Sequence, residues 1–429
     1  MCRSRATACR SEKILDDARG SASDTGSPGP QVSRSTALLR SPGRCGSAAP
    51  WAPILEGELG ERAARAVDEI ARALADFPCE DLSLGGGRAG EVIFRHYRGE
   101  SAEARLRLDE LLALAQALPP RPPSLYGEGL GIAWVAAHLG LGDMEDLPEA
   151  GLFALPSDFD LINGVVGAGV HALERLPLPE ARECLERCVD ALEESADGAA
   201  WRTTPRDGSW QRAKAPGDYF DLGVAHGLAG VVAFLGEAVA ADVRRSAAAR
   251  LLVRSVEWLL VRRLPVAGPC FPAIVGVGVA PEPSRLAWCY GDLGIAAALL
   301  QASRRMGETR REREAVEIAL RAAAASPVEG KVCDASLCHG AAGIAHVLNR
   351  MFHASGDERL LRAAREWFDR TLRFRRADAG IAGFSAWGPD GRHDEPGLLI
   401  GVSGIGLALL AAATDVEPAW DRVLLLSGM

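Results

Sequence analysis

Two kinds of helix-forming segment alternate along the chain from residue 51 onward. In the first kind, apolar residues recur every three or four positions among charged ones, as in ERAARAVDEIARALADF (61–77) and AEARLRLDELLALAQAL (102–118). This spacing predicts amphipathic helices that bury one face. Strand-like alternation of apolar and polar residues is scarce. The pattern therefore predicts an all-α protein.

The second kind of segment is short and apolar on all sides, and it begins with G-x-x-G or a close variant. An inner helix that is covered on every side has this composition. The spacing between the copies is irregular while their core is regular, which indicates one repeated unit with loops of variable length. The seven copies lie at 85–94, 126–139, 162–173, 225–235, 290–300, 338–348 and 400–410.

Seven repeats of this kind predict an α/α toroid with seven amphipathic outer helices and seven apolar inner helices. The glycines would allow the first turns of the inner helices to pack closely around a centre. An open α-solenoid is the alternative. Closure is favoured because neither end of the repeat region carries an obvious polar capping repeat.

Composition divides the chain into two parts. Residues 1–50 are rich in Ser, Gly, Pro and Arg, and we expect a disordered tail there, followed by one toroid domain over 51–429. The formal net charge of −9 argues against nucleic acid as the main partner. The longest apolar run, 398–413, is too short for a membrane span. Ten cysteines without a secretion signal suggest reduced thiols and a cytoplasmic location.

In a toroid the N-termini of all inner helices meet at one face, so residues far apart in sequence would come together there. Cys289, Cys338 and His339 would then form a set of two thiolates and one imidazole. Zinc held by three protein ligands keeps a fourth position open, as in catalytic sites. Buried cysteines beside a helix-capping histidine are the simpler alternative. The residues preceding the third to sixth inner segments are Asp160, His226, Cys289, Tyr290, Cys338 and His339.

Four stretches carry a family resemblance. They are DFDLINGVVG (158–167), DLGVAHGLAG (221–230), SRLAWCYGDLG (284–294) and SLCHGAAG (336–343). Together they resemble the lanthionine synthetase C family, the cyclases of lanthipeptide biosynthesis, over about residues 80–425. The resemblance implies an α/α toroid that holds one zinc ion.

The resemblance also implies roles for single residues. Cys289, Cys338 and His339 match the zinc ligands of the family, and His226 matches its general acid or base. Three further matches to active-site residues are Asp160, Arg285 and Tyr290. For these three a structural role stays open: a helix N-cap for Asp160, an ion pair that holds the loop for Arg285, and wall packing for Tyr290.

The implied reaction adds a peptide Cys thiol to dehydroalanine or dehydrobutyrine and forms a thioether ring. The implied substrate is a dehydrated precursor peptide, and a separate dehydratase would have to prepare it. The long loop 201–223, which carries two Trp and leads into His226, is expected to contact the peptide. Two alternatives remain: an enzyme that adds glutathione or another thiol to dehydrated peptides, and a non-catalytic peptide-binding scaffold. A zinc prenyltransferase fits less well, because its Asp-type ligand and aromatic lining are missing.

Overall fold

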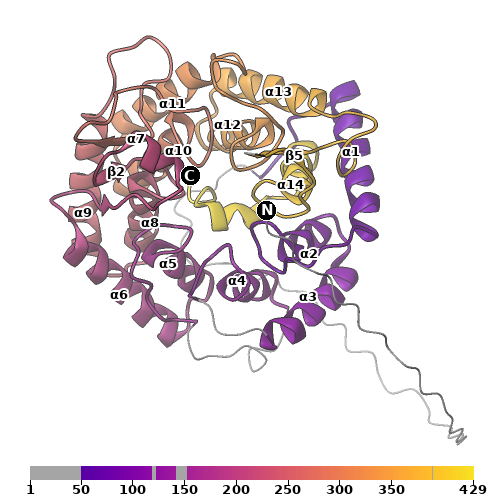
Figure 1. Cartoon of the computed structure of the whole chain (residues 1–429), viewed down its shortest axis with the longest axis horizontal. Helices are drawn as coiled ribbons and strands as arrows, with labels where there is room; N and C mark the ends of the chain where they lie inside the picture. The colour runs from indigo at the N-terminus through magenta and orange to yellow at the C-terminus, as the bar shows by residue number, and fades with distance from the viewer. Residues whose placement is uncertain (1–49, 118–121, 142–151, 389) are drawn as a thin grey trace, which may run out of the picture. The chain divides into compact units, whose positions relative to one another are not determined.

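The computed structural model describes residues 50–117, 122–141, 152–388 and 390–429. Almost the whole of the predicted tail, and part of the segment after the second inner helix, lie outside these residues. Contacts within the chain define one compact unit over Ala48–Met429. Its helices form two concentric layers around a centre, as Figure 1 shows.

All seven predicted inner helices are present, and each is buried nearly all round. In α8, for example, every residue except Glu237 and Ala240 is buried. The inner helices are α2 (Arg88–Tyr97), α4 (Leu130–Leu139), α5 (Val165–Glu174), α8 (Leu228–Ala240), α10 (Asp292–Met306), α12 (Ala341–Ser355) and α14 (Val402–Ala413).

Six outer helices fall within the described residues, and each buries one face, as the amphipathic pattern predicts. The segment that would supply a seventh follows α4 and includes residues 142–151, outside the described part of the chain. The outer helices are α1 (Gly57–Ala75), α3 (Ser101–Gln116), α6 (Pro179–Ser195), α9 (Arg245–Leu260), α11 (Thr309–Ala323) and α13 (Glu358–Arg373).

The ring of inner helices is closed. Each inner helix contacts the next in chain order, and α14 contacts α2 to complete the circle. Outer helices pack on the inner helix that precedes them, except that the first outer helix, α1, packs on the last inner helix, α14. The prediction of a closed toroid is confirmed, and the open solenoid is excluded.

A closed circuit of backbone hydrogen bonds joins the seven loops that precede the inner helices. Each loop donates to the loop of the next repeat, and the last returns to the first, so that all seven inner helices begin at one face. The bonds run from Gly85 N to Tyr126 O (2.9 Å), Leu125 N to Ile162 O (3.0 Å), Leu161 N to Ala225 O (3.2 Å), Val224 N to Cys289 O (2.9 Å), Cys289 N to Cys338 O (3.3 Å), Cys338 N to Leu399 O (2.7 Å) and Leu399 N to Gly85 O (2.9 Å).

The repeated glycine in the first turn of each inner helix has a steric cause. The preceding loop folds back so tightly that a Cβ at this glycine would lie 1.7 to 3.0 Å from the carbonyl oxygen six residues earlier, in all seven repeats. At Gly404 the distance to the Leu398 oxygen is 1.9 Å. Only glycine fits this position without a shift of the backbone.

The C-terminal segment lies at the centre of the ring (Figure 1). It contains the short 3-10 helix η2 (Ala419–Leu424), whose carbonyl groups accept hydrogen bonds from Tyr126 (2.7 Å, at Val423) and from Trp288 (3.1 Å, at Leu424). The buried Asp421 carboxylate accepts from His346 and from Arg350 of α12. The helical ring is therefore a packed core and not an open channel.

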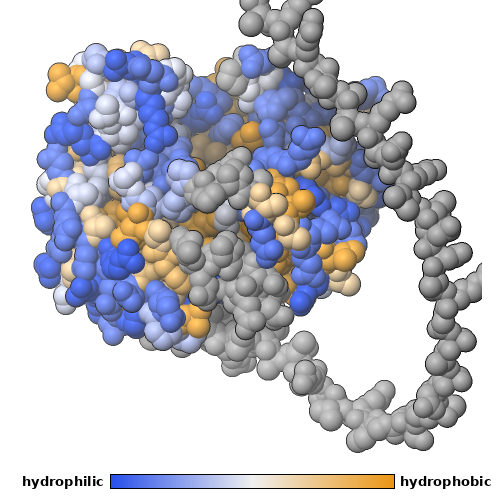
Figure 2. All heavy atoms as spheres, turned by 60° about the horizontal axis from the view of Figure 1, so that its bottom comes forward, coloured by the Kyte–Doolittle hydropathy of each residue, from blue (hydrophilic) through white to orange (hydrophobic). Residues whose placement is uncertain are grey.

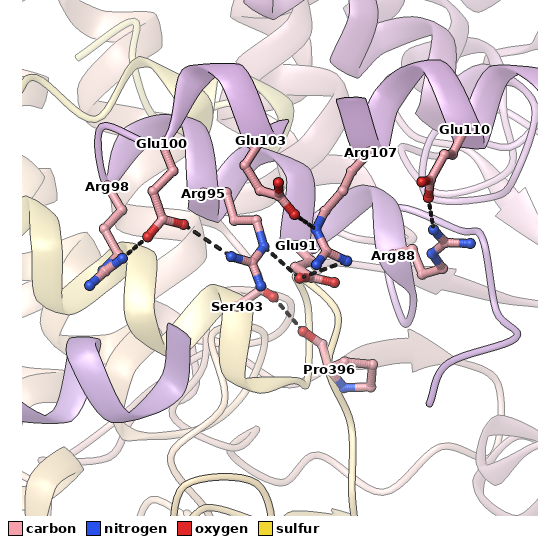
Figure 3. Close-up of polar contacts among 10 residues, drawn as sticks. All are labelled: Arg88, Glu91, Arg95, Arg98, Glu100, Glu103, Arg107, Glu110, Pro396 and Ser403. Carbon is pink, nitrogen blue, oxygen red and sulfur yellow. Dashed lines mark hydrogen bonds and ion pairs between the residues drawn. The ribbon is translucent and has the colours of Figure 1, made fainter. Parts of the chain in front are cut away.

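A network of ion pairs joins the inner helix α2 to the outer helix α3 (Figure 3). The Arg95 guanidinium lies 2.6 Å from Glu91 and 3.0 Å from Glu100, and Arg107 of α3 lies 3.5 Å from Glu91. Both Arg95 and Glu91 are buried, so each charge depends on its partners. The network fixes α2 beside the point where the ring closes.

Short strands lie outside the helical layers. The strands β1 (Arg202–Thr203), β2 (Tyr219–Asp221) and β3 (Ile274–Gly276) form one antiparallel sheet, and β4 (Ala386–Gly388) and β5 (Gly391–His393) form a hairpin. On the face shown in Figure 2, hydrophilic side chains cover most of the outer surface. None of the helices in the described residues combines the length and the apolar composition needed to cross a membrane.

Adding one methyl group at the repeated glycine should destabilise the fold. Alanine is favoured over glycine inside a helix by about 1 kcal/mol, but at Gly404 its Cβ would overlap the Leu398 carbonyl. We expect Gly404→Ala to lower the free energy of unfolding by about 2 kcal/mol or more, measured by urea denaturation.

The matched control is Gly236→Ala within α8. There the nearest atom to a new Cβ is the Cα of Ala302 at 3.5 Å, an ordinary contact. We expect this variant to be unchanged or more stable by up to about 1 kcal/mol. Equal stability of the two variants would contradict the steric explanation.

Candidate active site

Cys289, Cys338 and His339 lie on two neighbouring loops of the closed circuit. The loop before α10 carries Cys289, and the loop before α12 carries the other two. The backbone N–H of Cys289 donates to the carbonyl of Cys338. One ligand atom from each of the three side chains lies within 4.8 Å of the others. The structure therefore brings the predicted ligand set together.

The charges of this cluster favour a thiolate. The pKa of the Cys289 thiol is lowered to about 5, chiefly by a hydrogen bond from the thiol of Cys338; His339 and Arg285 also lower it, and burial opposes them. The negative Cys289, together with burial, raises the pKa of the Cys338 thiol. Without a cation the two sulfurs thus compete for one proton, which is the behaviour expected of a dithiolate site that a metal would neutralise.

The cluster has the composition of a metal site. Two sulfurs and one imidazole nitrogen are donors that a soft or borderline divalent ion takes, and three protein donors leave a fourth position open. Within the described residues, this is the one group of three or more His, Cys, Asp and Glu close enough to share an ion. Cys333, five residues before Cys338, lies outside it and donates to the Lys331 carbonyl instead.

His226 and Asp160 form a second pair on the adjoining repeats. The Nδ1 of His226 lies 2.6 Å from the Asp160 carboxylate, and the His226 side chain is 39% exposed. Burial alone would lower the pKa of His226. The hydrogen bond and the negative charge of Asp160 raise it, and so does the charge of Asp221, so the net pKa is raised. His226 can therefore hold a proton at the face of the ring where the inner helices begin.

Asp160 has a structural role as well, although not the one considered from the sequence. The residue that caps α5 is Gly164, so Asp160 is not the N-cap. One carboxylate oxygen accepts from the backbone N–H of Asn163 at 2.7 Å, and the other accepts from His226. The turn therefore fixes the carboxylate that orients the imidazole.

Tyr290 links the cysteine cluster to the histidine pair. It follows Cys289 directly, is buried, and its ring centroid lies 6.5 Å from that of His226. Its hydroxyl donates to the Asp221 carboxylate at 2.9 Å. Burial and the charge of Asp221 raise the pKa of Tyr290, so the phenol stays protonated. Tyr290 therefore packs into the wall and also lies beside the other candidate site residues.

Asp221 was not predicted as a site residue. It is fully enclosed, and burial raises its pKa to about 6 against the hydrogen bond from the Gly223 N–H. Its place in the sequence, six residues before Gly227 as Asp334 is six before Gly340, indicates a turn-forming acid and gave no signal of a site residue. Arg285 occupies the same place in the fifth repeat. It is exposed, and its positive charge lowers the pKa of Cys289.

A family model described as lanthionine synthetase C-like protein matches residues 56–425. The chain belongs to the lanthionine synthetase C-like family. Among solved structures, nisin cyclase is similar, with a TM-score of 0.69 and 17% sequence identity over 86% of this chain and 98% of that chain. At this identity the likeness shows that the lanthionine synthetase C-like chain shares the fold of that cyclase. Among curated proteins, none matches the sequence significantly.

The pairing of His226 with Asp160 should be visible in a titration. Asp160 raises the pKa of His226, so the protonated imidazole persists to higher pH and contributes stability that is lost as pH rises through that pKa. We expect Asp160→Asn to lower the pKa of His226, measured by NMR of its ring carbons. Asp158→Asn is the control, since Asp158 pairs with Arg206 and should leave the titration unchanged. An unchanged pKa in Asp160→Asn would contradict the pairing.

Proposed function

We propose that this protein is a zinc-dependent lanthipeptide cyclase that adds peptide Cys thiols to dehydroalanine or dehydrobutyrine. The observation that carries the proposal is the placement of a Cys–Cys–His donor cluster next to a proton-holding His–Asp pair on one face of the ring. An addition of a thiol to an activated double bond needs both a thiolate and a proton donor.

Cys289, Cys338 and His339 are the residues that would hold the zinc ion. Zinc held there would supply the means to lower the pKa of a substrate thiol, so that its sulfur would be a thiolate at neutral pH. The two protein thiolates keep the site electron-rich, which favours a reactive sulfur over an inert one. Arg285 offsets part of the negative charge that collects there.

In the addition, the S–Cβ bond forms as the C=C π bond breaks, and the electron pair moves to the α-carbon and its carbonyl oxygen as an enolate. His226 then transfers its proton to the α-carbon, and Asp160 holds the imidazole in place and favours its charged form before the transfer. The proton of the thiol replaces the one that His226 gave, so the peptide keeps its mass. Because its hydroxyl hydrogen rotates, Tyr290 could turn from Asp221 toward the enolate oxygen.

The substrate is a peptide that is already dehydrated. The addition starts from double bonds that a dehydration reaction must first form in the peptide. We propose that a separate dehydratase prepares them. The cysteines within the described residues are free, in keeping with a reducing cytoplasmic location.

The metal assignment predicts about one zinc ion per chain in the purified protein. Cys289→Ala and Cys338→Ala should each lose most of it, because two donors hold zinc far less tightly than three. Elemental analysis measures the content. Cys333→Ala is the matched control, because Cys333 is exposed and lies outside the cluster. Full zinc retention in either ligand variant would sink the assignment.

The reaction is tested with a dehydrated, Cys-containing peptide. Free thiols, counted by alkylation, should disappear while the peptide mass stays constant. His226→Asn should keep its zinc and slow ring closure by about 10²-fold or more, the usual contribution of a general acid. If peptide thiols persist and glutathione is added to the peptide instead, the protein is a glutathione-adding relative and the cyclase assignment is wrong.

A further inference from the structure

The segment between β1 and β2, here called the flap, lies against Tyr290, next to the loops that carry the candidate site residues. It carries the short helix α7 (Trp210–Lys214), which has no buried residue. In Figure 1 α7 lies inside the circle of outer helices, near α10. Two ion pairs hold the flap at its ends: Arg206 lies 2.6 Å from Asp158, and Lys214 pairs with Glu282. The flap is therefore tied to the loops on both sides of the site.

Trp210 and Gln211 of α7 both contact Tyr290. The ring of Trp210 stands edge-on to the ring of Tyr290, with centroids 5.5 Å apart and planes at 84°. The next residue, Gln211, directs its side-chain nitrogen to the Tyr290 hydroxyl at 3.5 Å. Trp210 nevertheless remains 43% exposed. One part of the indole thus touches the site wall while the rest is open to a ligand.

Each arginine of the flap, and its lysine, pairs with a carboxylate. Arg202 pairs with Asp197, Arg206 with Asp158, Arg212 with Asp207 and Lys214 with Glu282. The indole of Trp210 is the large apolar surface left open beside Tyr290. A ligand held there gains by covering it with an apolar group, whereas an acidic group placed against the indole would lose hydration and find each cation of the flap already paired.

We propose that Trp210 is a specificity-determining residue that contacts the side chain next to the reacting dehydro amino acid and selects a bulky apolar one. This inference rests on the proposed function for the nature of the ligand. Tyr290 joins the Trp210 ring to the cysteine cluster and to His226, so a dehydro residue at the site brings its neighbour in the peptide against the indole. A peptide residue that can stack on the indole is held; an acidic one is disfavoured.

The test uses binding of two short synthetic peptides to the full chain loaded with zinc. Each peptide has one dehydroalanine and no Cys, so it cannot form a ring, and the residue next to the dehydroalanine is Leu in one and Asp in the other. Isothermal titration calorimetry should show that the wild-type protein binds the Leu peptide about tenfold more tightly. In Trp210→Ala this ratio should fall below about twofold, and Trp210→Phe should keep most of it.

Leu114→Ala is the matched control, because Leu114 lies on the outer helix α3 and is 45% exposed, close to the value for Trp210. It should keep the wild-type ratio. Since α7 has no buried residue, Trp210→Ala should also keep its zinc and its helical circular dichroism. A tenfold ratio in Trp210→Ala, or no preference in the wild type, would overturn the inference. A wild-type preference without ring closure in the Cys-containing peptide would refute the cyclase function and leave the role of Trp210 intact.

Discussion

Cys289 stands between two bonds of the backbone circuit that joins the seven loops. Its N–H donates to Cys338, and its carbonyl accepts from Val224, two residues before His226. These backbone bonds fix the loops that carry His226, Cys289 and Cys338 relative to one another. Each bond contributes about 1 kcal/mol, and the circuit has no free end at which it could open. The position of every candidate side chain depends on this closed ring of backbone contacts.

The loop beside the cysteine cluster carries a cation where several other repeats carry a carboxylate. In three of these loops, the carboxylate lies six residues before the glycine that caps the following inner helix and accepts a hydrogen bond from the backbone N–H two residues further on. The distance is 2.7 Å for Asp81, 2.8 Å for Asp221 and 2.9 Å for Asp334. In the fifth repeat the same place is taken by Arg285, next to the cysteine cluster. A carboxylate there would oppose thiolates, whereas the guanidinium favours them. The repeated loops form the scaffold, and the positive charge of Arg285 favours the thiolate of Cys289 in the neighbouring cluster.

The sequence predicted the inner helices well, because the preceding loop lies so close to the first turn that glycine is required there. Gly90, Gly343 and the other repeated glycines are therefore visible in the sequence. It also predicted which donors would meet, since each precedes an inner helix. The sequence did not predict that η2 fills the centre, because that contact joins residues such as Tyr126 and Val423, far apart in the chain and without a shared pattern. Asp221 was missed for a related reason: its carboxylate resembles the turn-forming acids of the other loops, and only its contact with Tyr290 sets it apart.

The helix pair formed by α1 and α14 joins the two ends of the ring. Its outer helix, α1, is the first of the ring, and its inner helix, α14, is the last. The N–H groups of Ile54 and Leu55 both donate to the carbonyl of Ala412, at 2.8 and 2.9 Å. In an open solenoid, repeats can fold one after another as they leave the ribosome. Here the loop of Cys338 lacks its neighbour at Leu399 until the last inner helix has been synthesised. The order of events during translation is thereby constrained: the circle closes last, and the loop that carries Cys338 and His339 reaches its native contacts only after Leu399 has been synthesised.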